Sequence, residues 1–132
     1  MEIVYKTNVI PNADEVITLY ASAGLNRPID DKERIARMYA NSNLVITAWD
    51  GEKLVGVSRS LTDFCYCCYL SDLAVMEEYK KCGIGKRLIE ITRQEIGGQV
   101  MLLLLSAPGA MGYYPKVGFE AVHNGFIIHR KR

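Results

Sequence analysis

The 132-residue sequence has little net charge, no long apolar run and no internal repeat. Sixteen Lys and Arg oppose fifteen Asp and Glu, so no overall field attracts nucleic acid or an anionic membrane. No apolar stretch approaches the ~20 residues that a membrane span needs, and no signal peptide opens the chain. These absences, with a hydrophobic content of 49%, predict a single cytoplasmic domain over residues 1–132 that has no nucleic-acid or membrane partner.

Cysteine is also scarce, and its spacing does not suit a metal. The four cysteines are Cys65, Cys67, Cys68 and Cys82. A zinc site needs four well-placed ligands, and His123 and His129 do not form a ligand pair, so we expect no metal. Strand alternation would put Cys65 and Cys67 on one face of a sheet and Cys68 on the other, as small, reduced hydrophobes.

Apolar periodicity and turn residues divide the chain into short elements. We expect strands at residues 2–8, 43–49, 53–62, 65–75, 100–107, 118–122 and 125–131. We expect helices from a capping box at Asn12 to Gly24, from Asp30 or Asp31 through Tyr39, from the end of the glycine turn to Ile96, and over residues 109–117. The order β-α-α-β-β-β-α-β-α-β-β predicts a mixed α/β fold with a mostly antiparallel sheet and a central parallel β-α-β unit at residues 70–106.

A glycine turn between the fourth strand and the third helix has the composition of an anion site. Basic residues surround Gly83 and Gly85, and the backbone N–H groups of Cys82 to Lys86 can point out of such a turn at a helix N-terminus. The spacing fits neither the Walker A loop nor the dinucleotide fingerprint G-x-G-x-x-G. A nucleotide-binding module of another kind is therefore disfavoured, and a turn that uses glycine only for tight packing stays open.

Two segments together resemble a known family. Residues 72–90, DLAVMEEYKKCGIGKRLIE, resemble motif A of the GNAT superfamily of acyl-CoA N-acyltransferases, whose pattern [RQ]-x-x-G-x-[GA] aligns with Lys80, Gly83 and Gly85. Lys80 departs from the usual Gln or Arg. The segment YYPKVGFEAV, residues 113–122, is similar to the late F-Y-x-x-x-G-F segment of that family. The resemblance implies a GNAT fold and an acetyl-CoA-dependent acyltransferase.

The resemblance implies where acetyl-CoA binds. Its phosphates would lie on the glycine turn, at Lys80, Lys81, Cys82, Gly83, Ile84, Gly85, Lys86 and Arg87. Its pantetheine arm would run along Leu73, Ala74 and Val75 like an added strand, because residues 70–75 would splay away from residues 101–106. A bulge near Leu73 would aim its N–H at the thioester oxygen as a small oxyanion hole.

The same resemblance implies direct attack of an amine on the thioester, with no covalent enzyme intermediate. Asp72 is the expected base or amine ligand, with Glu77 and Glu78 as runners-up; the alternative for Asp72 is a charge partner for a neighbouring Lys or Arg. Tyr114 is the expected contact and proton donor for the departing thiolate, and Tyr113 is the expected packing aromatic. Pro115 biases Tyr114 away from helical geometry.

The acceptor is less defined. Family analogy builds its pocket from residues 24–31, 58–61 and 123–125. A cationic amine could bind to Asp30, Asp31 or Asp63, although two of these three are expected to be helix caps or turn residues. Core packing is expected for Tyr20, Tyr39 and Trp49 in preference to an aromatic wall. We expect a monomer or homodimer that acetylates a small primary amine; the alternative is a catalytically silent acyl-CoA-binding sensor or regulatory module.

Overall fold

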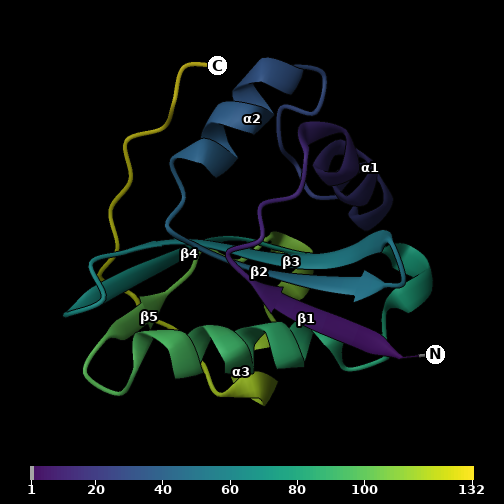
Figure 1. Ribbon diagram of the computed structural model, residues 1–132. Helices are drawn as coiled ribbons and strands as arrows, with labels where there is room; N and C mark the ends of the chain where they lie inside the picture. Colours follow the sequence, from purple (N-terminus) through teal and green to yellow (C-terminus); the bar gives the residue numbers. More distant parts are fainter. Residues whose placement is uncertain (1) are drawn as a thin grey trace.

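The computed structural model describes residues 2–132 and shows a sheet between two unequal helical layers (Figure 1). The strands are β1 (Ile3–Thr7), β2 (Leu44–Asp50), β3 (Lys53–Thr62), β4 (Cys67–Val75) and β5 (Met101–Leu103). Helices α1 (Ala13–Ala23) and α2 (Lys32–Ala40) cover one face, and α3 (Ile84–Ile96) covers the other. The predicted mixed α/β class is confirmed.

The strands pair in chain order, β1-β2-β3-β4-β5. The first four are antiparallel, and β5 lies parallel to β4 through the pairs Cys67↔Met101, Cys68↔Leu102 and Tyr69↔Leu103. Because β5 ends at Leu103 while β4 continues to Val75, the outer edge of β4 has no strand beside it over its last residues. The predicted splay of the parallel β-α-β unit is confirmed.

Local signals set the ends of the first two helices. The Asn12 side chain accepts the Glu15 N–H and the Glu15 carboxylate accepts the Asn12 N–H, so the expected capping box is present. Asp31 caps α2 by accepting the Arg34 N–H, and Gly24 ends α1 in the left-handed conformation, φ 73°. The apolar faces of these helices are buried in the core, and Tyr20 on α1, Tyr39 on α2 and Trp49 on β2 are buried there as expected.

The cysteine-rich segment differs from its prediction. Strand β4 begins at Cys67, because the Asp63 carboxylate accepts backbone N–H groups from Cys65, Tyr66 and Cys67 and so closes a tight turn before it. These hydrogen bonds lower the pKa of Asp63 to about 2. Cys68 is buried, but Cys65 and Cys67 are exposed, so the expectation that all three pack as small hydrophobes was wrong.

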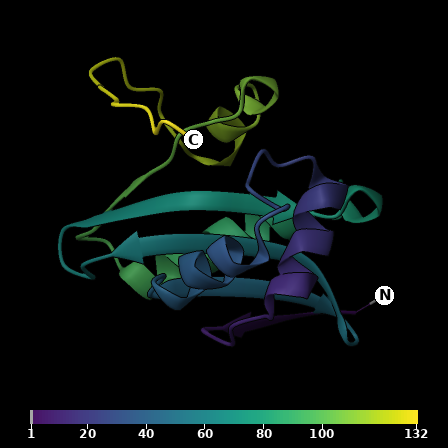
Figure 2. The same cartoon turned by 90° about the horizontal axis from the view of Figure 1, so that it is seen from above.

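The chain after β5 also departs from the prediction. The expected helix at residues 109–117 is reduced to the 3₁₀ turns Pro108–Ala110 and Tyr114–Val117, where Pro108 and Pro115 remove backbone donors. Neither expected strand within residues 118–131 forms in the part of the chain that the structure describes. We call residues 119–132 the C-terminal arm; it extends beyond the β4 edge of the sheet (Figure 2). A strand needs a neighbouring edge, and the arm makes no such pairing here.

Across residues 2–132, no helix combines the length and apolarity that crossing a membrane requires.

Candidate active site

The outer edge of β4 exposes alternate backbone groups. The Met76 N–H donates to the Val55 carbonyl at 2.9 Å, so in this antiparallel pair the backbone groups of every second β4 residue face β3. Ala74 belongs to that inward set, whereas the N–H and C=O groups of Leu73 and Val75 point toward the opening left by β5. Of the three residues expected beside a pantetheine arm, only Leu73 and Val75 offer free backbone groups, which corrects the expectation for Ala74.

The bulge in β4 lies earlier than predicted. The register with β3 shifts between Arg59 and Ser60, which leaves Ser71 as the extra residue, while Leu73 pairs regularly opposite Ser58. The bulge therefore lies two residues before Leu73, where it was expected. The outward direction of the Leu73 N–H follows from strand alternation, and the bulge at Ser71 sets where that alternation begins.

The glycine loop, residues 80–85, leads into helix α3, whose N-terminus has no side-chain cap in the described part of the chain. Gly83 is the N-cap of α3 with φ 79°, and no side chain accepts a hydrogen bond from this end of the helix within residues 2–132. The Arg87 N–H already bonds to the Gly83 carbonyl at 3.1 Å, so the donors left over are the N–H groups of Ile84, Gly85 and Lys86. Together with the helix dipole, these groups suit an anionic ligand such as a diphosphate.

Basic side chains surround these donors. They belong to Lys80, Lys81, Lys86 and Arg87, all of which are exposed. Lys80 pairs with Glu77 at 2.8 Å, and Lys81 adopts a left-handed φ of 73°. The side chains therefore add positive charge around the loop, while the backbone supplies the directed donors.

Tyr113 lies over the start of α3. A Cβ atom added at Gly85 would stand 3.0 Å from the Tyr113 Oη and 3.8 Å from the Val75 Cγ2. A side chain at position 85 would therefore crowd Tyr113, which would have to shift by a few tenths of an ångström to admit it. Tyr113 brings its hydroxyl to the junction of the glycine loop and the free edge of β4.

Tyr114 points elsewhere. Its ring packs edge-on against Tyr113 at 5.3 Å and Phe119 at 5.5 Å between centroids. Burial raises the pKa of Tyr114, and the neighbouring Tyr113 adds to the shift; burial alone raises the pKa of Tyr113. Both phenols are protonated at neutral pH, but Tyr113 is the one whose hydroxyl reaches Gly85 in this conformation.

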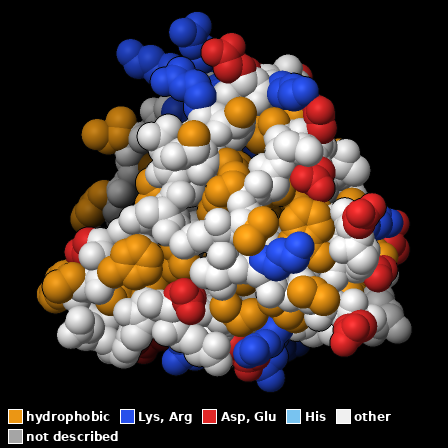
Figure 3. Space-filling model, viewed as in Figure 1, with side chains coloured by type: hydrophobic (Ala, Val, Ile, Leu, Met, Phe, Trp, Pro, Cys, Tyr) orange, Lys and Arg blue, Asp and Glu red, His pale blue; other side chains and the backbone are white. Residues whose placement is uncertain are grey.

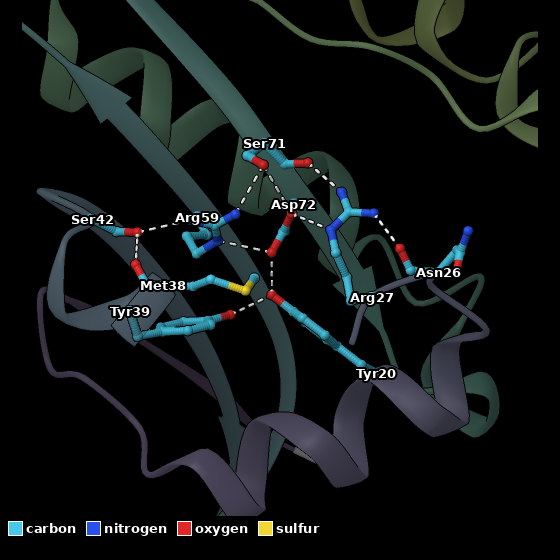
Figure 4. A network of polar contacts seen from close by, with 9 residues as sticks. All are labelled: Tyr20, Asn26, Arg27, Met38, Tyr39, Ser42, Arg59, Ser71 and Asp72. Atoms are coloured by element: carbon cyan, nitrogen blue, oxygen red, sulfur yellow. Dashed lines mark hydrogen bonds and ion pairs between the residues drawn. The ribbon is translucent and has the colours of Figure 1, made fainter. Parts of the chain in front are cut away.

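Asp72 is the centre of a buried polar network (Figure 4). Its side chain is 0% exposed; Oδ1 accepts from Arg27 Nε at 2.7 Å, and Oδ2 accepts from Arg59 Nε at 2.8 Å and Tyr20 Oη at 2.6 Å. The Tyr20 hydroxyl also bonds to that of Tyr39 at 2.5 Å. Burial raises the pKa of the Asp72 carboxyl, but the hydrogen bond and charge of Arg59 outweigh it, so the pKa lies below its ordinary value.

This environment does not suit the expected role of Asp72 as a base. Two arginines and a phenol occupy its oxygens, and the carboxylate has no exposed surface from which to receive a proton. The alternative role, a charge partner, agrees with the geometry. The sequence signal for it was Arg59 itself, a charge within the otherwise apolar and small-residue run of β3.

The other expected carboxylates are more open. Glu77 lies on the 3₁₀ turn Glu77–Tyr79 after β4, where the hydrogen bond and charge of Lys80 lower its pKa, and Glu78 beside it is exposed. Asp31 and Asp63 serve as a helix cap and a turn residue, which leaves Asp30 as the uncommitted carboxylate of the three named for a cation. No group of three His, Cys, Asp or Glu side chains in residues 2–132 is arranged for a metal.

Comparison with known proteins gives one family match. Residues 17–128 match the family model described as acetyltransferase (GNAT) domain. No curated protein matches the chain in sequence.

Solved structures resemble the whole chain. A probable acetyltransferase from meticillin-resistant Staphylococcus aureus is 21% identical, with TM-score 0.84 over 98% of this chain and 100% of that one. A GNAT-family acetyltransferase from Streptococcus pneumoniae is 25% identical, with TM-score 0.78 over 99% and 100%. An aminoglycoside N-acetyltransferase in complex with CoA is 13% identical, with TM-score 0.71 over 99% and 96%.

Proposed function

The chain belongs to the GNAT family of acetyltransferases, and from that premise we propose that it transfers the acetyl group of acetyl-CoA directly to a small primary amine. Enzymes of this family use acetyl-CoA. The observation that carries the proposal is the free edge of β4 leading into the uncapped N-terminus of α3. A strand-like arm and a diphosphate fit these two features in that order along the chain.

The residues present fit such a cofactor. We propose that Leu73 and Val75 hydrogen-bond the pantetheine amides, and that the N–H groups from Cys82 to Lys86 hold the phosphates. Lys80, Lys81, Lys86 and Arg87 add positive charge around them. The cofactor supplies an acetyl group activated as a thioester, and the Leu73 N–H is the proposed donor to its carbonyl oxygen.

Asp72 is proposed as a positioning residue. Its ion pairs with Arg27 and Arg59 tie the loop after α1 and strand β3 to the β4 bulge, which fixes the strand that presents Leu73. The ammonium form of the acceptor must then give its proton to water or to an exposed carboxylate before the neutral amine attacks, because Asp72 has no free oxygen facing solvent.

Tyr114 is proposed as the proton donor to the departing thiolate, on the strength of its place in the Y-x-x-x-G-F motif. Tyr114→Phe should lower kcat by about 10²-fold and leave the Kd for CoA near its wild-type value, since only the transferred proton is lost. Tyr113→Phe is the matched control and should leave kcat close to wild type. Stopped-time acetylation assays and calorimetric CoA titrations measure both; the reverse ranking would move the donor to Tyr113, whose hydroxyl lies at Gly85.

A panel of small amines tests the activity itself. Acetyl-CoA is supplied with each amine, and release of CoA thiol is followed with a thiol reagent. The exposed Cys65, Cys67 and Cys82 give a stoichiometric background that an amine-free control subtracts. Acetylated amine detected by mass, with thiol released beyond that background, is the expected result.

A silent acyl-CoA-binding module is the second candidate, and the engagement of Asp72 by two arginines is the observation that favours it. It predicts calorimetric binding of CoA with no acetylated product from any amine in the panel. Such an outcome would replace the enzyme proposal while keeping the assigned cofactor site.

A further inference from the structure

The polar network at Asp72 carries more positive than negative charge. Among residues 2–132, Asp72 is the one carboxylate that pairs with Arg27 or Arg59, at 2.7 Å and 2.8 Å. Burial is the largest cause that raises the pKa of Tyr20 and of Tyr39, so both phenols are neutral at physiological pH. Two guanidinium groups and one carboxylate therefore leave the network with one positive charge that no anion balances.

The excess charge reaches solvent at Arg27. Arg59 approaches Asp72 from β3 with its side chain 9% exposed, whereas Arg27 approaches from the loop after α1 with its side chain 27% exposed (Figure 4). The Arg27 Nε donates to Asp72, and its Nη1 and Nη2 donate to the carbonyls of Asn26 and Ser71, each at 2.7 Å. A guanidinium has five N–H donors. In the described part of the chain, one donor on each terminal nitrogen of Arg27 therefore remains for a ligand.

Arg27 also lies beside the open edge of β4. Its Nη2 donates to the carbonyl of Ser71, the extra residue of the bulge, and Leu73 follows two residues later on the same strand. Two strand residues span about 7 Å, and the Leu73 N–H is the proposed donor to the thioester oxygen. A carboxylate bound at Arg27 would therefore hold an amine on its neighbouring carbon within reach of that thioester.

The nearby acidic side chains do not neutralise Arg27. Asp30, on the same loop, is exposed and forms no ion pair among residues 2–132. Glu77, which follows β4, pairs with Lys80 at 2.8 Å. Figure 3 shows both acidic and basic side chains on the face that it draws, and the net charge of the chain is only +1. Selection of an anionic ligand would thus come from the local charge of Arg27 and not from the overall field.

We propose that Arg27 binds a carboxylate of the acceptor, and that the acceptor is therefore an amino acid or another small amine that carries a carboxylate. The inference rests on the proposed acetyl transfer and names its substrate class. The guanidinium group is the side chain best suited to hold a carboxylate, and a second carboxylate would balance the two arginines of the network. The neutral amine nitrogen bonds to the acetyl carbon as the carbon–sulfur bond breaks. The products are an N-acetylamino acid, CoA thiol and the proton released by the ammonium form.

Paired acceptors test the need for a carboxylate. Glycine, alanine, serine and glutamate are each compared with the corresponding α-amide, and kcat/KM for acetylation is measured for both members of each pair. Amidation removes the carboxylate and lowers the pKa of the α-amine, so a site without recognition would favour the amide. We expect the wild type to prefer at least one amino acid over its amide by about 10–100-fold, the value of a hydrogen bond between charged groups. Acetylation with no preference for the acid in any pair would overturn the inference.

Arg27→Gln tests whether this preference comes from the Arg27 side chain. The ratio of kcat/KM for the acid to that for the amide should fall by about 10-fold or more. A loop disturbed by the lost tie to Asp72 would slow both acceptors alike, so the ratio reports on recognition and not on folding. Arg37→Gln is the matched control, because Arg37 is an exposed arginine of α2 with no ion pair in residues 2–132, and it should keep the wild-type ratio. An unchanged ratio in Arg27→Gln would refute the role of Arg27 in binding.

Product binding separates failure of this inference from failure of the proposed function. N-acetylglycine and N-acetylglycinamide are titrated calorimetrically into the protein with CoA present; glycine derivatives have no side chain that an acceptor site could exclude. Tighter binding of the acid than of the amide, with that difference lost in Arg27→Gln, supports the carboxylate site even if no amine is acetylated. Equal or absent binding of the two probes, or a difference that Arg27→Gln leaves unchanged, would overturn the inference even if amines are acetylated.

Discussion

At Gly85, the addition of one methyl group tests how the proposed cofactor site is built. It lies in the first turn of α3, and a Cβ there would stand 3.0 Å from the Tyr113 hydroxyl. Gly85 therefore brings the glycine loop close to Tyr113, the N-cap residue of the 3₁₀ turn Tyr114–Val117, which follows β5 in the chain. Its spacing in the motif was evident in the sequence, but its contact with a tyrosine 28 positions later was not.

A double-mutant cycle on Gly85 and Tyr113 measures that contact. Gly85→Ala gains up to about 1 kcal/mol of helix propensity and loses about 1–3 kcal/mol to crowding, so the single change alone is not diagnostic. Removing the hydroxyl in Tyr113→Phe relieves the crowding, and we expect a coupling free energy of roughly 0.5–3 kcal/mol in urea unfolding. Gly98→Ala is the control, because a Cβ at Gly98 meets nothing within 4 Å, and its effect on stability should simply add to that of Tyr113→Phe. If the effects of Gly85→Ala and Tyr113→Phe were also additive, the contact between the two residues would be refuted.

At the scale of elements, the edge of β4 decides whether a pantetheine arm can be held as an added strand. The geometry divides neighbouring residues, with Ala74 bonded to β3 and with Leu73 and Val75 facing outward. Amide hydrogen exchange resolves this alternation residue by residue. We expect the Ala74 amide to be protected with or without ligand.

The amides of Leu73 and Val75 should exchange rapidly in the free protein and slow on addition of CoA, because an unpaired edge N–H is protected only when a ligand accepts its hydrogen bond. NMR-detected exchange at one protein concentration makes the measurement, and the Val57 amide, paired with Ala74 on β3, serves as the internal reference. Protection of Leu73 before CoA is added would mean that the edge is closed.

The network at Asp72 joins α1, α2, β3 and β4, so disrupting it should lower the free energy of unfolding. Asp72→Asn leaves Arg59, only 9% exposed at its side chain, without its counter-charge, and removal of one partner of a buried pair costs about 3–5 kcal/mol. Asp14→Asn breaks the exposed pair with Lys32, whose side chains are 64% and 72% exposed, and should cost at most about 1 kcal/mol. Urea unfolding at neutral pH compares the two. If Asp72→Asn lowered the free energy of unfolding no more than Asp14→Asn does, the ion pair of Asp72 with Arg59 would not be needed for stability.

The same network gives a pH dependence with a defined sign. The pKa of Asp72 is lower in the folded protein than its ordinary value, so its contribution to the free energy of unfolding is complete above pH ~3.9 and is lost as pH falls through the folded pKa. The stability difference between wild type and Asp72→Asn should therefore shrink in acid. Unfolding curves between neutral pH and pH ~2 test this; a difference that instead grew in acid would contradict the ion pairs.

Local signals explain which elements could be predicted. The hairpin of β2 and β3, the capping box at Asn12 and the glycine loop depend on residues close in sequence, and all three appear where the sequence placed them. Strands were predicted at residues 118–122 and 125–131, but strand formation needs an edge from elsewhere, which no local pattern supplies. The Asp72 network joins residues up to 52 positions apart, so its arginines and tyrosines could not be assigned to it before the helices were packed on the sheet.

On the scale of the whole molecule, stability should depend on whether a ligand occupies the open edge of β4. Any ligand or partner that binds only the folded state raises the free energy of unfolding by mass action.

CoA should stabilise the protein more than ATP and pantetheine do together, because the glycine loop and the β4 edge both belong to a single β-α-β unit. At a ligand concentration of 100 Kd the gain is about 2.7 kcal/mol. ATP can engage the N-terminus of α3 and free pantetheine can engage Leu73 and Val75, but only CoA links the two, and linkage turns the second contact into an intramolecular one. Thermal unfolding with each ligand at equal concentration should thus show a midpoint shift for CoA that exceeds the sum for ATP and pantetheine, with NAD close to ATP. An equal or larger shift with ATP or NAD would instead assign the glycine loop to a nucleotide, since the free edge of β4 would then contribute nothing to recognition.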